Sequence, residues 1–340
     1  MKKISFLLLF LWSSATYGQK NLAVETYNQG LLLYYNKDFS SALEKFSKAI
    51  ESDPSLGDAY YNRALCNMQT GNFDEAITDY TKSLEKSSVN LAAIIYGGRA
   101  KAKYLNDQKS DALIDYLEAI KKDDKNPDWY YFAGGILFEM GKYQQAIEQF
   151  NAAINLRNNF AEAYNDRGSA KKILEDYQGA ISDFHQARRF KPELVVAYNN
   201  LATTLIKAGD SESAMNEFNQ SLVVSEKQSE TYVKRGKFKF DSGDFEGAMR
   251  DFNRAIEISP LNFNALNNRA CLKNKMKDYQ GALEDLNKAI NIDPSFGYAY
   301  LNRGIVKENL LDLTGACADW NLALQNGMSS VKIFIQSECN

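Results

Sequence analysis

The stretch YVKRGKFKFDSGDFEGAMRDFNRAIEISP, residues 232–260, decides the fold of this chain. Displaced by 34 residues, it aligns with LNNRACLKNKMKDYQGALEDLNKAINIDP, residues 266–294, so that Ala248 falls on Ala282 and Pro260 on Pro294. A fixed period of this length is typical of a solenoid, in which one small unit stacks on the next. The period therefore governs the interpretation of almost every other residue.

Counted so that the recurring alanine is position 20, the period predicts nine repeats, at 23–56, 57–92, 93–126, 127–160, 161–194, 195–228, 229–262, 263–296 and 297–330. Position 20 is always Ala, position 8 is Gly or Ala, position 27 is Ala or Ser, and position 24 is large and apolar. Positions 20, 24 and 27 share one helical face. Small side chains there let two antiparallel helices approach, and the large side chain at position 24 fills the space between them.

This pattern, over residues 23–330, resembles the tetratricopeptide repeat (TPR). The resemblance implies an all-α fold: a right-handed superhelical α-solenoid of nine helical hairpins with a capping helix in residues 331–340. It also implies a concave groove lined by the first helix of each hairpin. Members of the family mostly bind peptides or partner proteins and carry no catalysis of their own, so we expect a non-enzyme.

The composition offers little material for other functions. The formal net charge is −3, so no basic surface for nucleic acid is predicted. His185 is the only histidine, and no cysteine or histidine cluster has metal-binding spacing. We therefore expect no metal, no cofactor and no nucleic acid partner.

The first 18 residues have the outline of a secretory signal peptide. Lys2 and Lys3 precede the apolar run 4–12, and small residues then lead to a cleavage site before Gln19, which opens a short lead at 19–22. An uncleaved membrane anchor is the alternative, although the apolar run is short for a span of about 20 residues. We expect an exported bacterial protein, periplasmic or secreted, without a membrane span in its mature form.

A pair of opposite charges recurs inside the repeats. Position 7 is Arg and position 23 is Asp in the same six repeats: Arg63 with Asp79, Arg99 with Asp115, Arg167 with Asp183, Arg235 with Asp251, Arg269 with Asp285, and Arg303 with Asp319. The other three repeats have neither. This co-occurrence predicts an ion pair between the two helices of each hairpin; the alternative is that the arginines bind an acidic ligand.

Two cysteines occur near the end of the chain. Cys317 occupies position 21, which is apolar in every other repeat, and Cys339 lies in the expected cap that follows. Since disulfides persist in exported proteins, we expect a bridge between Cys317 and Cys339, as in similar exported repeat proteins with cysteine-bearing caps. Two free thiols are the alternative.

The resemblance also indicates where a partner would bind. In peptide-binding relatives, positions 2, 5, 6, 9, 12 and 13 face the groove, and asparagine at position 6 bonds the backbone of an extended peptide. The residues implied for partner binding are Asn28, Asn62, Asn200, Asn268 and Asn302, with Tyr27, Tyr61, Tyr131, Phe132 and Lys234. The asparagines are interrupted at Gly98, Phe132, Asp166 and Lys234, which leaves a solvated polar face as an alternative. The tyrosines could equally pack between repeats.

These observations favour a non-catalytic interaction scaffold of the cell envelope that holds an extended peptide or partner protein in its groove. The alternative is a structural subunit of an envelope assembly that uses its convex face or its ends. The identity of the partner and the oligomeric state are left open by the sequence.

Overall fold

The structure, a computed structural model, describes residues 20–86 and 91–339. Every regular element in these ranges is a helix. The expected signal peptide and residues 87–90 of the second repeat lie outside the described residues. The chain divides into two compact units, with the boundary between Glu175 and Asp176, inside the expected fifth repeat.

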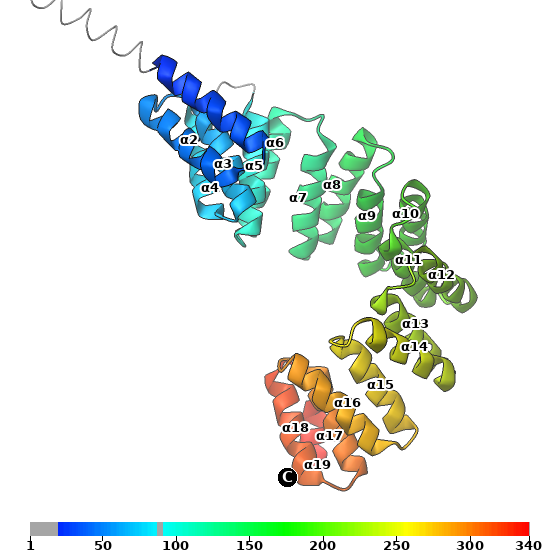
Figure 1. Ribbon diagram of the computed structural model, residues 1–340. Coiled ribbons are helices and arrows are strands. Elements are labelled where there is room, and N and C mark those ends of the chain that lie inside the picture. Colours follow the sequence, from blue (N-terminus) through cyan, green and yellow to red (C-terminus); the bar gives the residue numbers. More distant parts are fainter. Residues whose placement is uncertain (1–19, 87–90, 340) are drawn as a thin grey trace, which may run out of the picture. The chain divides into compact units, whose positions relative to one another are not determined.

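The first unit contains nine described helices, several of which appear as neighbouring pairs in Figure 1. They are residues 20–35, α2 (Phe39–Ser52), α3 (Gly57–Thr70), α4 (Phe73–Lys86), α5 (Ala92–Leu105), α6 (Lys109–Lys122), α7 (Pro127–Glu139), α8 (Tyr143–Leu156) and α9 (Ala161–Ile173). The hairpins are α3 with α4, α5 with α6, and α7 with α8, and each second helix also packs on the next first helix.

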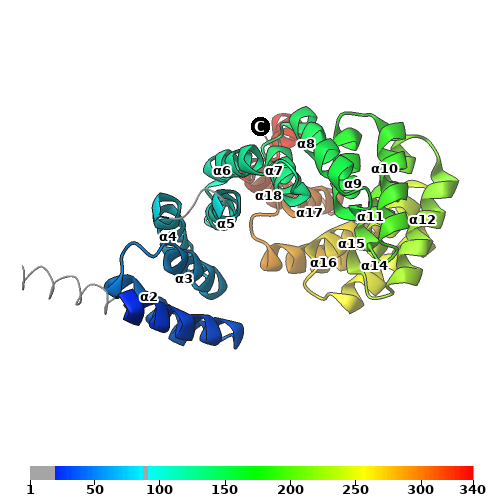
Figure 2. The same cartoon turned by 90° about the horizontal axis from the view of Figure 1, so that it is seen from above.

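The second unit repeats this arrangement. Its helices are α10 (Tyr177–Phe190), α11 (Val195–Lys207), α12 (Ser211–Val224), α13 (Ser229–Asp241), α14 (Phe245–Ile258), α15 (Phe263–Lys275), α16 (Tyr279–Ile292), α17 (Gly297–Asn309), α18 (Leu313–Gln325), the short 3₁₀ helix η2 (Ser329–Val331) and α19 (Lys332–Glu338). The pairs α11–α12, α13–α14, α15–α16 and α17–α18 form hairpins. Figure 2 shows helices α10 to α12 and α14 to α18 of this unit from above.

Aspartate side chains begin many of the second helices. Asp244, for example, accepts a 2.8 Å hydrogen bond from the backbone N–H of Gly247 in the first turn of α14. The same cap recurs at the start of five other second helices: Asp38, Asp176, Asp210, Asp278 and Asp312. An oxygen at this position satisfies a backbone N–H that would otherwise lack an intrahelical partner.

The core is divided among the hairpins instead of forming one central cluster. In the fourth repeat, Phe150 at position 24 is fully buried against Gly134 at position 8. A Cβ added at Gly134 would lie 2.7 Å from Cε1 of Phe150, so the absent side chain is what lets the two helices approach. Gly30 with Phe46 and Gly236 with Phe252 show the same contact.

The last helix covers the end of the second unit. Phe334 in α19 stacks on Trp320 in α18, with ring centroids 5.2 Å apart, and Val331 of η2 is fully buried beside them. The Sγ atoms of Cys317 and Cys339 lie 2.02 Å apart, at bonding distance. The terminal hairpin is thereby shielded from water, as the end of a stack of repeats requires.

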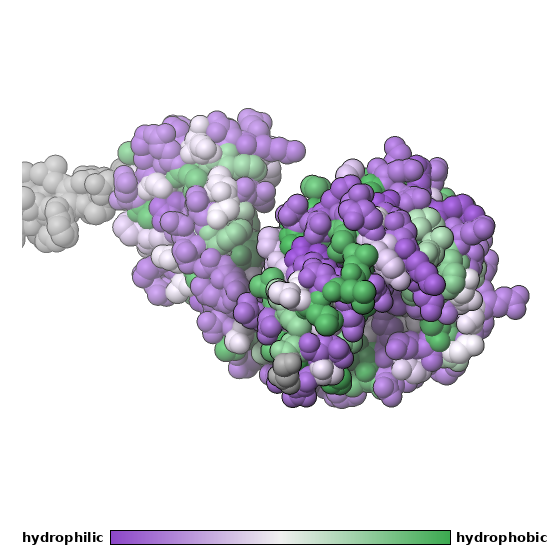
Figure 3. Space-filling model, turned by 90° about the horizontal axis from the view of Figure 1, so that it is seen from below, coloured by the Kyte–Doolittle hydropathy of each residue, from purple (hydrophilic) through white to green (hydrophobic). Residues whose placement is uncertain are grey.

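Over the described residues, the predicted all-α fold of repeated hairpins followed by a C-terminal helix is confirmed. The nine repeat boundaries stay a prediction. On the face drawn in Figure 3, apolar side chains form separate patches among polar ones. None of the described helices is long and apolar enough to cross a membrane.

Candidate functional site

The first helices of successive hairpins contact one another within each unit. These contacts join α3 to α5 and α7 to α9 in the first unit, and α11 to α13, α13 to α15 and α15 to α17 in the second. We call the surface made by these helices, together with the helix 20–35, the first-helix face of each unit. All ten residues expected to bind a partner belong to these helices.

Side chains on this face bond one another across neighbouring repeats. Nδ2 of Asn62 donates to the hydroxyl of Tyr27 at 2.9 Å, and Nδ2 of Asn302 donates to Oδ1 of Asn267 at 2.8 Å. Both bonds join position 5 of one repeat to position 6 of the next. The amides of Asn62 and Asn302 therefore already serve contacts between repeats, a role that the family resemblance did not imply.

The other expected polar contacts are distributed along both units. Asn28 is exposed on the helix 20–35, whereas Asn200 in α11 and Asn268 in α15 are half-buried. Lys234 in α13 forms an ion pair with Glu230, with Nζ 3.4 Å from Oε1. The partner-binding role of these residues stays a prediction.

The expected aromatic contacts are partly used in packing. Tyr61 is half-buried against Tyr80, with ring centroids 5.9 Å apart, and Tyr131 lies 4.8 Å from the ring of Phe160. Phe132 is different, because 41% of it remains exposed. The structure brings Tyr131 and Phe132 together at one cavity.

That cavity opens on the first-helix face of the first unit. Its volume is about 270 Å³, and its lining comes from α5, α6, α7 and α9: Tyr104, Tyr116, Tyr131, Phe132, Gly135, Ile136, Glu139 and Asp166. We call it the aromatic cavity. Tyr131, Gly135 and Glu139 follow one another at intervals of four residues and so share one face of α7. A Cβ at Gly135 would meet no atom within 4 Å, so the missing side chain leaves open space between its neighbours.

Two carboxylates border the aromatic cavity. Glu139 is neutralised, since Oε1 accepts from the Tyr104 hydroxyl at 2.5 Å and Oε2 lies 3.1 Å from Nζ of Lys109. Asp166 accepts hydrogen bonds of 2.9 Å from the Tyr131 hydroxyl and from Nδ2 of Asn165. In the part of the chain that the structure describes, no lysine or arginine forms an ion pair with Asp166.

Burial sets the proton affinity of this carboxyl. Burial raises the pKa of Asp166 above its ordinary value, hydrogen bonds from Tyr131 and Asn165 lower it, and the charge of Glu162 raises it again. Burial likewise raises the pKa of Tyr131. An ionised Asp166 is therefore costly in the free protein and is favoured by any cation that enters the cavity.

Sequence reasoning did not identify Gly135, Glu139, Tyr116 or Asp166 as parts of one site. Tyr116 occupies a core position in its repeat, and it is only 3% exposed. Two departures from the repeat pattern carried a signal: Asp166 replaces the asparagine common at position 6, and Gly135 leaves position 9 without a side chain.

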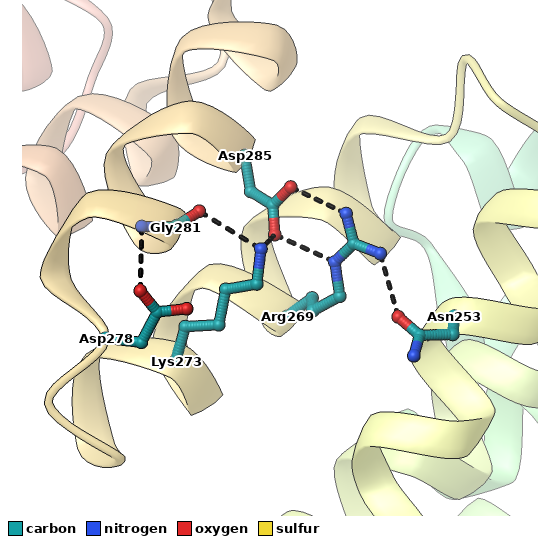
Figure 4. A network of polar contacts seen from close by, with 6 residues as sticks. All are labelled: Asn253, Arg269, Lys273, Asp278, Gly281 and Asp285. Atoms are coloured by element: carbon teal, nitrogen blue, oxygen red, sulfur yellow. Dashed lines mark hydrogen bonds and ion pairs between the residues drawn. The ribbon is translucent and has the colours of Figure 1, made fainter.

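A second set of contacts explains the recurrent arginines. Figure 4 shows Arg269 of α15 directed at Asp285 of α16, with Nε and Nη2 donating at 2.8 and 2.6 Å. Lys273 adds its Nζ at 2.8 Å. The same bidentate pair forms between Arg63 and Asp79, Arg99 and Asp115, Arg235 and Asp251, and Arg303 and Asp319.

Each of these arginines, and Arg167 as well, also reaches the preceding repeat. Nη1 of Arg269 donates to Oδ1 of Asn253 in α14 at 2.8 Å, as Figure 4 also shows. The equivalent acceptor at position 25 is Ser47, Thr81, Asn151, Asn219 or Asn287 for the other arginines. The guanidinium groups are thus engaged on both sides, which favours the structural role over an acidic-ligand clamp.

The other charged residues near these positions differ in what the structure shows of them. Arg167 and Asp183 lie on opposite sides of the boundary between the two units, so their pairing stays a prediction. The sixth repeat lacks the recurrent pair, and there Glu217 pairs with Arg188 of the preceding repeat. Nδ1 of His185 lies 3.1 Å from Nη2 of Arg188, and burial followed by this positive charge lowers the pKa of His185.

In the second repeat, Asn67 stands where most repeats with the recurrent pair have lysine. A polar cavity of about 460 Å³ lies beside Arg63 and Asp79 there.

The two other cysteines are thiols of low reactivity. Burial raises the pKa of Cys66 to about 12 and that of Cys271 to about 11, so both stay protonated at neutral pH. Among the described residues, no group of three or more His, Cys, Asp or Glu side chains is placed to hold a metal ion.

Comparison with known proteins supports the family assignment. Profiles described as tetratricopeptide repeat match residues 27–90, 195–227, 229–260 and 263–296, and one described as TPR repeat matches residues 134–172. Together the matched residues make up more than half of the chain.

Curated relatives resemble only part of it. Tetratricopeptide repeat protein 13 of Homo sapiens is 25% identical over 134 residues, which are 39% of this chain and 15% of that protein. The Hsp70-Hsp90 organizing protein of Triticum aestivum is 26% identical over 182 residues, covering 43% of this chain and 31% of that protein. The chain thus spans less than a third of the length of these two relatives.

Solved structures show the same fold at low sequence identity. A tetratricopeptide repeat protein from Parabacteroides merdae superposes with a TM-score of 0.62 at 19% identity, over 73% of this chain and 99% of that one. The C-terminal part of a TPR repeat-containing protein from Cytophaga hutchinsonii gives a TM-score of 0.60 at 19% identity, over 71% and 98%.

Proposed function

This chain belongs to the tetratricopeptide repeat family, and on that premise we propose that it is a non-catalytic interaction scaffold of the cell envelope. It binds an extended peptide or a segment of a partner protein on its first-helix face. Members of this family generally mediate contacts between proteins, and one relative is named as an organizer of Hsp70 and Hsp90.

The aromatic cavity is the observation that carries this proposal. It is concave, its walls are largely aromatic, and a few polar groups converge on it, which is the usual composition of a ligand site. Partly exposed aromatic side chains such as Phe132 are preferred anchors for protein partners. Packing alone does not account for an open space of this kind next to Gly135.

The envelope location rests on the N-terminal sequence. We propose that residues 1–18 direct export and are removed, so that the mature protein begins at Gln19. An oxidising compartment would also keep Cys317 and Cys339 joined. N-terminal sequencing and non-reducing peptide mapping of protein from its own host test both points; a retained Met1 or two free thiols would contradict them.

Site-specific photo-crosslinking tests the binding surface. A photoreactive phenylalanine at Leu105, which is exposed on the first-helix face, should give a discrete adduct in the host. The same residue at Ile114, which is also exposed and lies on the second helix of that hairpin, is the matched control. Gly135→Leu, which fills the aromatic cavity, should suppress the Leu105 adduct.

One observation favours the structural alternative. Leu311 in the turn between α17 and α18 and Ile333 on α19 are highly exposed apolar side chains at the C-terminal end of the second unit. Apolar surface at the end of a repeat array suits end-to-end contact. Adducts from Ile114 or Ile333 without any from Leu105 would contradict the scaffold proposal and support this structural alternative.

A further inference from the structure

We propose that the aromatic cavity binds a basic side chain, lysine or arginine, of the partner. This inference rests on the proposed function, because it names what one part of the first-helix face recognises. It assigns Asp166 as the counter-ion, Phe132 and Tyr104 as aromatic walls, and Gly135 as the residue whose small size leaves the space.

The cavity is shaped by three residues on one face of α7. Gly135 lies between Tyr131, one turn before it in α7, and Glu139, one turn after it. Both neighbours form hydrogen bonds to other helices. The Tyr131 hydroxyl donates to Asp166 in α9, and Glu139 accepts from the Tyr104 hydroxyl in α5. The two hydrogen bonds hold the walls apart, and the absent side chain of Gly135 leaves the space between them unfilled.

The two carboxylates at the cavity differ in their partners. Glu139 is balanced by Lys109, but among the described residues Asp166 receives only neutral donors, the Tyr131 hydroxyl and the Asn165 amide. A half-buried carboxylate without a cation is unfavourable. An entering ammonium or guanidinium group would complete the missing ion pair, and charge-assisted hydrogen bonds of this kind are stronger than neutral ones.

The aromatic walls of the cavity suit a cationic side chain. The ring of Phe132 stacks on Tyr116, with centroids 5.6 Å apart, and its remaining surface is open. Aromatic faces attract cations, and they also pack against the methylene groups of lysine or arginine side chains. An acidic ligand would instead meet the unpaired charge of Asp166, so the cavity selects against carboxylates.

Asp166→Asn is a well-matched variant for testing this inference. Five other repeats have asparagine at the same position, and the amide oxygen can still accept from Tyr131. The variant should therefore fold normally while losing the charge. Burial raises the pKa of Asp166, so the ionised carboxyl destabilises the folded protein at neutral pH. The free energy of unfolding of the Asp166→Asn variant at neutral pH should therefore be no lower than that of the unmodified protein.

The test is an NMR titration of the purified protein with single amino-acid probes. The probes are Nα-acetyl-lysine methylamide, the corresponding arginine compound, and the lysine compound acetylated at Nε, which is neutral. The cationic probes should shift the amide signals of Gly135 and Asp166 and lower the Asp166 pKa. The neutral probe and the Asp166→Asn variant should each show binding weakened by about tenfold or more.

Equal binding of the cationic and neutral probes, unchanged binding by Asp166→Asn, or no shift at Gly135 would each overturn the inference. If the Leu105 adduct forms in any of these cases, the proposed function stands without the basic side chain. If the cationic probe binds but no Leu105 adduct forms, the proposed function fails, and the assignment to a partner's side chain fails with it.

Discussion

Nη1 of Arg269 in α15 donates a 2.8 Å hydrogen bond to Oδ1 of Asn253 in α14. The other donors of this guanidinium bind Asp285 in α16, so one side chain joins two successive repeats. In a stack of repeats, stability depends on such contacts between neighbours as well as on each hairpin.

Asn253→Ala should therefore lower the free energy of unfolding by about 1.5 kcal/mol, since a charged donor loses its acceptor. Urea denaturation followed by circular dichroism measures the effect. Asn291→Ala, in an exposed position of α16, is the control and should change little. Equal losses of unfolding free energy in the two variants would show that the hydrogen bond between repeats does not contribute to stability.

Removing one partner of a buried pair should be more harmful than removing an exposed charge. Asp251 is 3% exposed and is bound by both Arg235 and Lys239. Asp251→Ala leaves these two cations without their carboxylate and should cost about 3 kcal/mol. Glu246→Ala, whose side chain is 91% exposed in the same helix, should lower the melting temperature far less. The hypothesis fails if both variants melt at the same temperature.

The sequence predicted the ion pairs because position 7 and position 23 change together from repeat to repeat. The same reasoning could have found the acceptors in the preceding repeat. Ser, Thr or Asn occupies position 25 before every repeat that has the arginine, whereas Leu117 and His185 stand there before two repeats that lack it. This signal spans two repeats and is missed when each repeat is considered by itself.

Only some of the turns between helices could be located from the sequence. Glycine marks only four of the turns inside the hairpins, Gly71, Gly141, Gly209 and Gly243, and all four have positive φ. Five other residues adopt the same backbone conformation without being glycine: Lys37, Asp107, Glu175, Lys277 and Leu311. The packing of the two helices sets the geometry of each turn and outweighs the local preference of these residues.

The aromatic cavity was beyond sequence reasoning for a different reason. Tyr104, Phe132 and Asp166 belong to three consecutive repeats, and only the stacking distance decides whether their side chains meet. The family pattern placed Tyr131 and Phe132 near a partner, but it gave no reason to connect them with Gly135 or with a missing cation.

Acid should weaken the protein through Asp285. Burial alone would raise the pKa of Asp285, but hydrogen bonds from Arg269 and Lys273 outweigh it and hold that pKa below its ordinary value. A lowered carboxyl pKa stabilises the fold above the unfolded-state pKa, about 3.9, and this contribution is lost as the pH falls further.

Asp285→Asn should therefore reduce the unfolding free energy at pH 7 and should flatten its dependence on pH below about 4. Urea denaturation at a series of pH values from 7 down to 3 measures both effects. A variant that loses stability with acid as steeply as the unmodified protein would show that Asp285 does not contribute to this dependence.

Two adjacent glycines of α7 should respond oppositely to the same substitution. Gly134 faces the buried ring of Phe150, and an added Cβ would lie 2.7 Å from Cε1. Gly135 faces the open aromatic cavity, where an added Cβ meets no atom within 4 Å. Gly134→Ala should therefore destabilise the protein by about 1 kcal/mol or more because of overpacking. Gly135→Ala should stabilise it by about 0.5–1 kcal/mol, since alanine favours the helix.

Urea midpoints of the two variants, measured side by side, test this contrast. If Gly135→Ala is stabilising, glycine is less favourable for stability than alanine at this position. Such a loss of stability is expected of a residue that is kept small for binding. If Gly135→Ala is instead as damaging as Gly134→Ala, the space beside Gly135 is filled by neighbouring side chains, and the aromatic cavity has no room for a partner's side chain.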